Sequence, residues 1–393
     1  MLFIGEGSTL AHAARVLALA AALPRSRYEV LLALPERYRD WVPTGVTWLP
    51  LETQDEAVFA VRLTEARPLF SAKTLARYHA LDLEMLNELR PDVVVGDLRL
   101  SLAVSAREAG VPYIAISNAY WSPDQPLRLE RPALHALRWM PPPLAELVFR
   151  ILVPGALRGH VRPLHKLMTA RGMKMRLDVQ RIVTEADVTL YADIPGLFPL
   201  VKDSPRQRLL GPVLWTPPVE LPSWWNELPA DRAVAYLSLG SSGDPRVLER
   251  LCGWLEQAEF TVMVATAGRA SMAPGPNRYI ADYLPGPLAC ERADIVVGNG
   301  GSPMATQALM AGKPVLGVCS NMDQFLNMRA LRARGAGLAL RADRLRQGRF
   351  ERAVDRLLGP RPCRAAETLR KEGAAMNPSA VLAEVIDGVV GRR

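Results

Sequence analysis

Residues 293–322 read ADIVVGNGGSPMATQALMAGKPVLGVCSNM, and this stretch decides the fold. Three consecutive apolar residues, Ile295 to Val297, predict a strand buried on both faces of a parallel sheet. The paired glycines that follow break the pattern. Ser302 then stands where a helix N-cap is expected, with Pro303 at the first helical position. Gly312 ends the helix and Pro314 opens the next apolar run. The stretch therefore predicts strand, tight turn, helix and strand.

The turn between that strand and that helix is a candidate anion site. The start of a helix presents unpaired N–H groups and a positive partial charge. Two glycines, Gly300 and Gly301, would let the backbone approach a ligand closely. A plain βαβ unit with a glycine turn and no ligand fits the same local pattern. Both interpretations stay open on this stretch alone.

The same alternation of strand and helix extends to both sides of a proline-rich run. Before that run we expect strands near residues 2–4, 28–34, 46–51, 93–96, 111–117 and 187–191, and helices at 10–23, 72–89 and 100–109. After it we expect strands at 233–239, 261–266 and 279–284, ahead of the quoted stretch. Repeated alternation of this kind indicates an α/β fold with parallel sheets.

The chain divides into two domains of this α/β kind. Residues 1–210 form the first domain, the proline-rich run 211–230 is the linker, and residues 231–393 form the second. Within the first domain, residues 121–180 are rich in proline, tryptophan and arginine and break the alternation. We expect loops and short helices there, forming a variable pocket. A last helix at 378–390 is expected to pack back on the first domain, and the cleft between the domains is the default site.

The composition limits which binding partners and which cellular compartment we expect for this protein. The net charge is +8, with the arginines scattered rather than blocked, and no zinc-finger spacing or basic arm supports nucleic-acid binding. The four cysteines show no CxxC spacing, which favours a reducing compartment. There is no long apolar run and no charged leader before the first strand. We expect a cytoplasmic protein, with peripheral association at the inner face of the membrane as an open option.

Several short motifs of the second half together resemble a known family. They are Asn299-Gly300-Gly301-Ser302, Gln307-Ala308-Leu309, Gly312-Lys313-Pro314 and Asp323-Gln324. In this order they are similar to the nucleotide-sugar-binding half of the UDP-glycosyltransferase type of GT-B glycosyltransferases, which includes bacterial natural-product and macrolide enzymes. The resemblance covers nearly the whole chain. It implies the GT-B fold, two Rossmann-like domains facing each other across a cleft.

The resemblance also implies donor-binding roles for these positions. Ser241 and the backbone of Asn299, Gly300, Gly301 and Ser302 would hold the diphosphate. Gln307 takes the ribose-binding position, while Tyr283 and Leu284 lie beside the nucleobase. Asp323 and Gln324 would bind hydroxyls of the sugar. Taken alone, this pair favours a helix N-cap with a solvated neighbour, and the surrounding motifs reverse that preference. Asn299, Met304 and Gln307 stand where the family has His, Thr and Glu.

A candidate base for glycosyl transfer lies in the first half. His12 follows the first strand, where the resemblance implies the family's histidine, and Asp97 ends a later strand at the edge where such sheets carry their sites. Histidine suits proton removal near neutral pH, and a carboxylate behind it fixes its tautomer. Each also has a plainer interpretation, His12 as a structural or surface residue and Asp97 as a helix cap. No cluster of metal ligands stands in the sequence, so we expect neither a metal nor a cofactor.

The sequence therefore predicts an inverting, metal-independent glycosyltransferase. It would move a sugar from a UDP- or dTDP-sugar, bound as a co-substrate, to a hydroxyl of an apolar small-molecule or lipid acceptor. Two alternatives remain. One is a GT-B sugar-nucleotide epimerase, which the histidine at position 12 disfavours. The other is a nucleotide-sugar-binding or partner protein of the same fold without catalysis.

Overall fold

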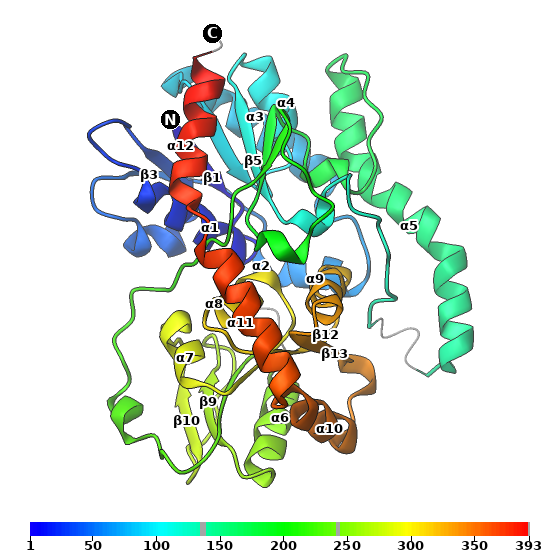
Figure 1. Ribbon diagram of the computed structural model, residues 1–393. Coiled ribbons are helices and arrows are strands. Elements are labelled where there is room, and N and C mark those ends of the chain that lie inside the picture. Colours follow the sequence, from blue (N-terminus) through cyan, green and yellow to red (C-terminus); the bar gives the residue numbers. More distant parts are fainter. Residues whose placement is uncertain (134–138, 241–243, 392–393) are drawn as a thin grey trace.

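The computed structural model describes residues 1–133, 139–240 and 244–391. The chain forms two α/β domains stacked one above the other, with the N-terminal half at the top of Figure 1 and the C-terminal half below it. Each domain is built on one parallel sheet covered by helices. These two sheets confirm the predicted α/β class and the predicted pair of Rossmann-like domains.

The N-terminal domain contains a seven-stranded parallel sheet in the order β3-β2-β1-β4-β5-β6-β7. Its strands are β1 (Leu2–Gly5), β2 (Leu31–Leu34), β3 (Thr47–Pro50), β4 (Val94–Asp97), β5 (Tyr113–Ser117), β6 (Val188–Tyr191) and β7 (Gln207–Leu209). The central strands are buried throughout, as expected for a parallel sheet covered on both faces. Its helices are α1 (Leu10–Ala22), α2 (Glu56–Thr64), α3 (Ala72–Leu89), α4 (Leu102–Glu108) and α5 (Pro142–Ala170).

The C-terminal domain contains a six-stranded parallel sheet in the order β10-β9-β8-β11-β12-β13. Its strands are β8 (Val234–Ser238), β9 (Thr261–Ala265), β10 (Arg278–Ala281), β11 (Ile295–Gly298), β12 (Val315–Cys319) and β13 (Gly337–Arg341). Its helices are α6 (Pro245–Gln257), α7 (Gly286–Arg292), α8 (Ser302–Met310), α9 (Met322–Ala333), α10 (Gln347–Leu357) and α11 (Pro360–Ala374). The stretch 293–322 thus forms β11, α8 and β12 at the centre of this sheet.

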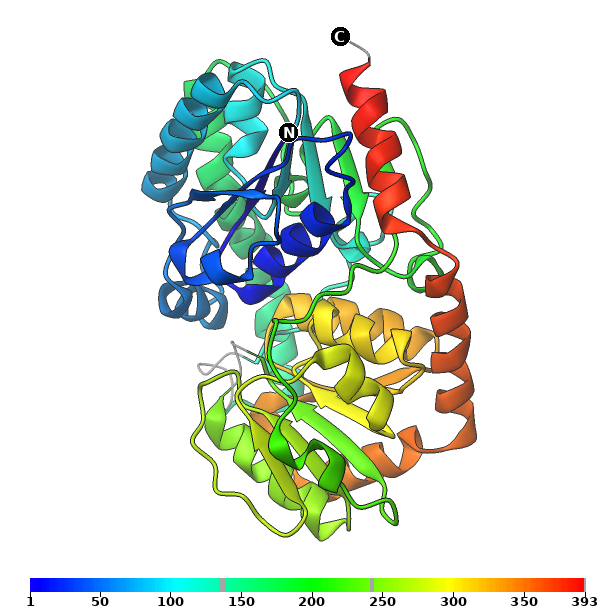
Figure 2. The same ribbon diagram turned by 90° about the vertical axis from the view of Figure 1, so that its left-hand side faces the viewer.

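The last helix, α12 (Pro378–Val390), lies on the N-terminal domain although it follows the C-terminal one. Figure 2 shows α11 and α12 running along one side of the molecule from the lower domain to the upper one. Leu382, Val385 and Ile386 are buried in the same core cluster as strands β1 and β4. Asp387 accepts hydrogen bonds from Tyr28 and Arg27. These contacts connect the two domains a second time, beside the linker.

The insert at 121–180 differs from the prediction of loops and short helices. It contains α5, a helix of 29 residues that continues through Pro154 and Pro163 (Figure 1). Each proline removes one helical N–H but leaves the helix continuous. Apolar side chains at three- and four-residue spacing, from Phe149 to Leu167, face the domain, and the packing of this face outweighs the two lost bonds.

The start of α8 also differs from the prediction. Gly301, not Ser302, is the N-cap, and Ser302 is the first helical residue. Ser302 already belongs to the helix, and its hydroxyl accepts a hydrogen bond from Asn118 in the other domain. Gly300 has a positive φ of 82°, and a Cβ there would lie 2.7 Å from the Cys319 sulfur. Glycine is therefore required in this turn for its backbone and for its packing.

Candidate active site

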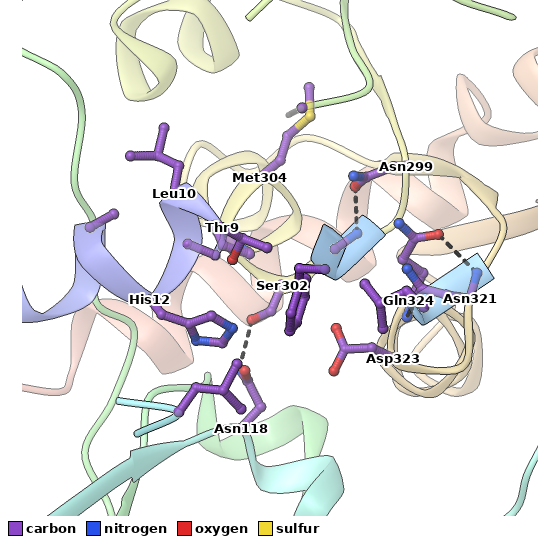
Figure 3. A pocket seen from close by; sticks show the side chains of 18 of the residues that line it. Thr9, Leu10, His12, Asn118, Asn299, Ser302, Met304, Asn321, Asp323 and Gln324 are labelled. Carbon is purple, nitrogen blue, oxygen red and sulfur yellow. Dashed lines mark hydrogen bonds between the residues drawn. The ribbon is translucent and has the colours of Figure 1, made fainter. Parts of the chain in front are cut away.

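The cleft between the domains holds a cavity of about 710 Å³. Residues of both domains line it, including the first turn of α1, the end of β4, the segment after β5 and the starts of α8 and α9. These are carboxyl ends of parallel strands, where the sites of open α/β sheets are found. Figure 3 shows the lining side chains, with His12 and Asn118 on one side and Ser302 and Asp323 on the other.

His12 and Asp97 lie together at the N-terminal wall of this cleft. The Nδ1 atom of His12 is 2.7 Å from Oδ1 of Asp97, and the carboxylate is buried while the imidazole is partly exposed. The Nδ1 atom therefore donates to the carboxylate, and the tautomer that results leaves the Nε2 lone pair without a proton. Leu98, directly after Asp97, has a left-handed φ of 55°. A residue other than glycine is strained in that conformation, and strained residues are often found beside functional groups.

Arg15 completes this group, and the sequence analysis missed it. Its Nε lies 2.6 Å from Oδ2 of Asp97 and its Nη2 lies 2.9 Å from Oδ1. Burial alone would raise the pKa of the Asp97 carboxyl, but Arg15 and His12 outweigh burial and hold that pKa below its usual range. Asp97 is thus kept ionised behind the imidazole. The spacing of three residues between His12 and Arg15, one helical turn, was the signal available in the sequence.

Asn118 connects this group to the opposite domain. Its Nδ2 donates to the Ser302 hydroxyl at 2.8 Å (Figure 3). Its Oδ1 accepts from Nη1 of Arg15 at 2.7 Å, and its Nδ2 also donates to Asp193 at 3.1 Å. Asp193 also accepts from the backbone N–H of Ala119. Burial raises the pKa of Asp193 to about 6, although these hydrogen bonds oppose the rise. A buried polar network therefore crosses the cleft from α1 to α8.

The turn before α8 is shaped by Asn299. The side-chain Nδ2 of Asn299 donates to the carbonyl of Leu239, and its Oδ1 accepts from the backbone N–H of Gly301 at 2.9 Å. Asn299 therefore ties the ends of β11 and β8 together and occupies one of the amides predicted to hold a diphosphate. The carbonyl of Gly300 accepts from Asn327. The remaining amides at the start of α8 point along the helix axis toward the cleft.

The end of the cleft near the linker is aromatic. The rings of Trp41 and Trp215 are 5.3 Å apart, and Trp41 meets Tyr283 edge-on with centroids 6.3 Å apart. Gln307 donates from Nε2 to the carbonyl of Trp215 at 2.7 Å. Leu284, beside Tyr283, is buried and lines the cleft. The residues predicted to meet a nucleoside, Tyr283, Leu284 and Gln307, therefore share one wall.

The other end of the cleft carries Asp323 and Gln324 at the start of α9. Oδ1 of Asp323 accepts from the indole N–H of Trp121 at 3.1 Å, a contact from the N-terminal domain that the sequence analysis did not foresee. Gln324 forms a capping box with Asn321, and its Oε1 accepts from the N–H of Ser320. The helix cap therefore uses the Oε1 of Gln324 and leaves its Nε2 for a ligand. Asp323 is free of the cap and faces the cleft.

Two further predictions can be placed only in part. Ser241, predicted to hold the diphosphate, lies outside the described residues, and its neighbour Gly240 lines the cavity. Within residues 1–133, 139–240 and 244–391 no group of three or more His, Cys, Asp or Glu side chains is arranged to hold a metal ion.

The cavity continues into the N-terminal domain as an apolar arm. Its walls come from α2, the loop after it, α5 and the segment 179–183, and the side chains are Phe59, Leu63, Leu69, Phe149, Val153, Leu157, Val179 and Ile182. His12 and Leu98 line the same cavity as these apolar side chains. A ligand with a polar end at His12 and an apolar body would fit this shape.

Two Rossmann-like domains that face each other across such a cleft define the GT-B class of glycosyltransferases. Residues 256–390 match the family model described as Erythromycin biosynthesis protein CIII-like, C-terminal domain. The chain is 43% identical over 361 residues to the PGL/p-HBAD biosynthesis glycosyltransferase Rv2958c of Mycobacterium tuberculosis, covering 91% of this chain and 84% of that one. The chain therefore belongs to the PGL/p-HBAD biosynthesis glycosyltransferase family, and it is a glycosyltransferase.

Two other relatives bear on the details of function. A PGL/p-HBAD biosynthesis rhamnosyltransferase of Mycobacterium bovis is 43% identical over 357 residues, covering 90% of this chain and 79% of the relative. An inactive PGL/p-HBAD biosynthesis glycosyltransferase of the same species is 41% identical over 251 residues, covering 63% of this chain and 69% of that one. One relative is thus named inactive, whereas the other is named for the sugar that it transfers.

Solved structures agree with the fold. The calicheamicin glycosyltransferase CalG4 superposes with a TM-score of 0.70 at 17% identity, over 100% of this chain and 98% of its own. The spinosyn rhamnosyltransferase SpnG superposes with a TM-score of 0.68 at 19% identity, over 98% of each chain. At these identities the likeness shows the GT-B fold and confirms that prediction. Across the described residues, no helix has both the length and the apolarity that crossing a membrane requires.

Proposed function

We propose that this glycosyltransferase is inverting and metal-independent, with His12 as the base and Asp97 as its partner. It takes a hexosyl group from a dTDP- or UDP-sugar and transfers it to a hydroxyl of an acceptor with a large apolar body. The observation that carries the proposal is the His12–Asp97–Arg15 group, which faces the start of α8 across the cleft and is joined to it through Asn118 and Ser302.

The chemistry follows from the positions of these atoms. The Nε2 atom of His12 takes the proton of the acceptor hydroxyl as its oxygen attacks the anomeric carbon. The bond from that carbon to the diphosphate oxygen breaks on the opposite face, so the configuration inverts. Asp97 accepts the Nδ1 proton and stabilises the imidazolium, and Arg15 keeps Asp97 ionised. The nucleoside diphosphate leaves with its charge stabilised by the amides at the start of α8.

The choice of donor rests on the described walls and on the relatives. Tyr283 and Leu284 would contact the nucleobase, Gln307 the ribose and Asp323 a sugar hydroxyl. The M. bovis relative is named a rhamnosyltransferase, and the SpnG rhamnosyltransferase has been solved with thymidine diphosphate. These names support dTDP-rhamnose as the first donor to test. No cofactor is required for such a direct displacement.

The acceptor side rests on the apolar arm of the cavity that His12 also lines. Its walls suit an alkyl or aryl body, while the hydroxyl stays at the imidazole. The relatives act in the biosynthesis of PGL, phenolic glycolipid, by their names. An alkylated phenol or its monoglycoside is therefore the acceptor class that we propose.

The test is a turnover assay with a panel of dTDP- and UDP-sugars and an alkylphenol acceptor. We expect release of nucleoside diphosphate, a glycosylated product of the expected mass, and an anomeric configuration opposite to that of the donor. Chelation of divalent ions should leave the rate unchanged. A product that retains the donor configuration would overturn the direct displacement.

A non-catalytic donor-binding protein is the second candidate. One relative is named inactive, and the side chains of Asn299 and Gln307 are bound to protein atoms. This candidate predicts a rise in melting temperature with a nucleotide-sugar but no turnover with any acceptor. A ligand at 100 times its dissociation constant would stabilise the fold by about 2.7 kcal/mol in either case, so the two candidates separate on turnover alone.

A further inference from the structure

The long helix α5 has two different faces. One face lines the apolar arm of the cavity with Phe149, Val153 and Leu157, and continues into the core with Leu164 and Leu167. These positions recur at three- and four-residue spacing, which places them on the same side of a helix. The helix lies on the outside of the molecule, along one edge of both domains in Figure 1. Its other face is therefore turned away from the protein.

The first half of that outer face is apolar. Leu144, Leu147, Ile151 and Leu152 are 47%, 55%, 68% and 62% exposed. Leu144, Leu147 and Ile151 follow the same three- and four-residue spacing, offset from the cavity-lining set. Single exposed leucines are ordinary on a protein surface, but four on two turns of one helix are not.

The second half of the outer face is basic. Arg158, Arg162 and Lys166 continue the line of Leu144, Leu147 and Ile151 along the helix at four-residue spacing, and all three are exposed. From residue 142 to residue 176 the sequence has seven Lys or Arg and one acidic residue, Glu146. Glu146 itself pairs with Arg150 at 3.2 Å. Six of the eight net positive charges of the chain thus lie in this segment.

An apolar strip followed by a basic strip on one helix face has the chemistry of a helix that lies in an anionic lipid surface. The apolar side chains enter the boundary of the acyl chains, and the cations meet the lipid phosphates. A protein partner would explain the apolar strip, but it would not by itself explain the excess of cations beside it. The charge therefore favours a lipid surface as the occupant.

The inner face of the same helix relates this outer surface to the proposed reaction. The apolar arm runs between α5 and α2, and His160 of α5 lies 3.2 Å from the carbonyl of Ala66, just after α2. A lipid-like acceptor at the membrane would have only one helix between it and the arm.

We propose that the outer face of α5 docks the protein on an anionic lipid surface, so that an acceptor held in that surface enters the arm beside α5. The delivery of the acceptor rests on the function proposed above, whereas the docking does not.

The docking is tested with full-length protein and vesicles of phosphatidylcholine, with and without phosphatidylglycerol. We expect co-sedimentation with the anionic vesicles alone, weakened by salt. The double variant Arg158→Glu/Arg162→Glu should bind at least about 30-fold more weakly, since each basic side chain near an anionic surface contributes about five-fold. Leu147→Asp/Ile151→Asp should lose binding as well, with an unchanged melting temperature.

Matched controls change the same residue types elsewhere. Leu221→Asp/Leu288→Asp replaces two leucines that are 47% and 44% exposed outside α5, and Arg352→Glu/Arg356→Glu reverses two exposed arginines of α10. Both controls should bind vesicles like the parent chain. Equal loss in a control, equal binding to neutral vesicles, or no vesicle binding at all would overturn the proposal, and the last outcome would point to a protein partner instead.

A pair of assays separates the docking from the proposed reaction. With a short water-soluble phenol as acceptor, the α5 variants should turn over like the parent chain. With a long-chain acceptor embedded in anionic vesicles, their rates should fall by a factor similar to the loss in binding. Absence of turnover in both assays would contradict the proposed function while the vesicle sedimentation still decides the docking.

Discussion

The side chain of Asn118 donates a hydrogen bond to the hydroxyl of Ser302 at 2.8 Å, and this bond spans the cleft between the two domains (Figure 3). Asn118 directly follows β5, and Ser302 is the first residue of α8. Through Arg15, the same amide is linked to the carboxylate behind His12. The positions proposed for the base and for the leaving diphosphate are therefore held in one buried network.

Replacing Asn118 should disturb both stability and turnover. Asn118→Ala leaves Arg15 Nη1, Asp193 Oδ1 and the Ser302 hydroxyl each without this partner. A buried polar group without its hydrogen bond costs about 1–3 kcal/mol, so we expect a fall of at least that size in the free energy of unfolding. Denaturant unfolding measures it, and kcat should fall as well. An unchanged kcat would show that the network does not position the base.

Replacing the proposed base, His12, should lower turnover without weakening donor binding. His12→Ala and His12→Gln should lower kcat by about 10²–10⁴-fold, the usual contribution of a general base. The affinity for the nucleotide-sugar should stay within about two-fold, because binding does not use the lost proton acceptor. His165→Ala, on the outer surface of α5, is the matched control and should keep full activity. Equal kcat in His12→Ala and His165→Ala would exclude His12 as the base.

Asp193 predicts a specific dependence of stability on pH. Burial raises its pKa to about 6 in the folded protein, whereas an unfolded chain has an aspartate pKa of about 3.9. The unfolded state therefore loses its proton first, and stability falls as pH rises from about 4 to about 6, by about 3 kcal/mol. Asp193→Asn lacks this titration. Subtracting its profile of unfolding free energy against pH from that of the parent chain should isolate the fall, and parallel profiles would contradict it.

Replacing Trp121 should weaken binding of the sugar part of the donor and leave binding of the nucleotide part unchanged. Its indole N–H donates to Asp323 Oδ1 at the proposed sugar end of the cleft, so Trp121→Phe keeps the ring but removes this donor. A hydrogen bond to a charged group contributes about 1.5–3 kcal/mol, and we expect KM for the donor to rise by roughly ten-fold or more. The dissociation constant of the free nucleoside diphosphate should not change. If the free nucleotide weakens as much as the nucleotide-sugar, Asp323 does not bind the sugar.

Much of the fold could be predicted because parallel sheets leave a strong trace in sequence. Runs such as Ile295–Gly298 and Val315–Cys319 are apolar at every position, and glycine and proline mark their ends. α5 could not be predicted in the same way. Proline disfavours the interior of a helix, so Pro154 and Pro163 indicate breaks, yet α5 continues through both because one of its faces is packed.

The sequence indicates the position of a residue where the end of a strand fixes it, and gives no signal where the contact of a residue depends on how the two domains close. His12 follows a predicted strand and Asp97 ends another, so both were placed at one sheet edge, and the structure has them 2.7 Å apart. Asn118 and Trp121 make their contacts with residues about 200 positions away. No local pattern encodes such a pairing, because it depends on how the two domains close.

The last prediction concerns Gln307, which stands where the family has glutamate. Its Nε2 donates to the carbonyl of Trp215 in the linker at 2.7 Å, and Gln307→Glu would place a carboxylate oxygen against that carbonyl oxygen. We expect the new side chain to turn away from the linker toward the cleft. The lost bond should cost about 1 kcal/mol of unfolding free energy.

The same change should strengthen donor binding. A carboxylate turned into the cleft can accept from both hydroxyls of a ribose, whereas the amide is committed to the linker. We expect the dissociation constant of a UDP-sugar to fall several-fold in Gln307→Glu, because a charged acceptor makes the stronger hydrogen bond. A dTDP-sugar has only the 3′-hydroxyl on its ribose ring and should gain less. Gln307→Ala is the control, since it loses the bond to Trp215 without offering a carboxylate. If Gln307→Glu and Gln307→Ala bind donors with similar affinity, the role of Gln307 is limited to its hydrogen bond from α8 to the linker.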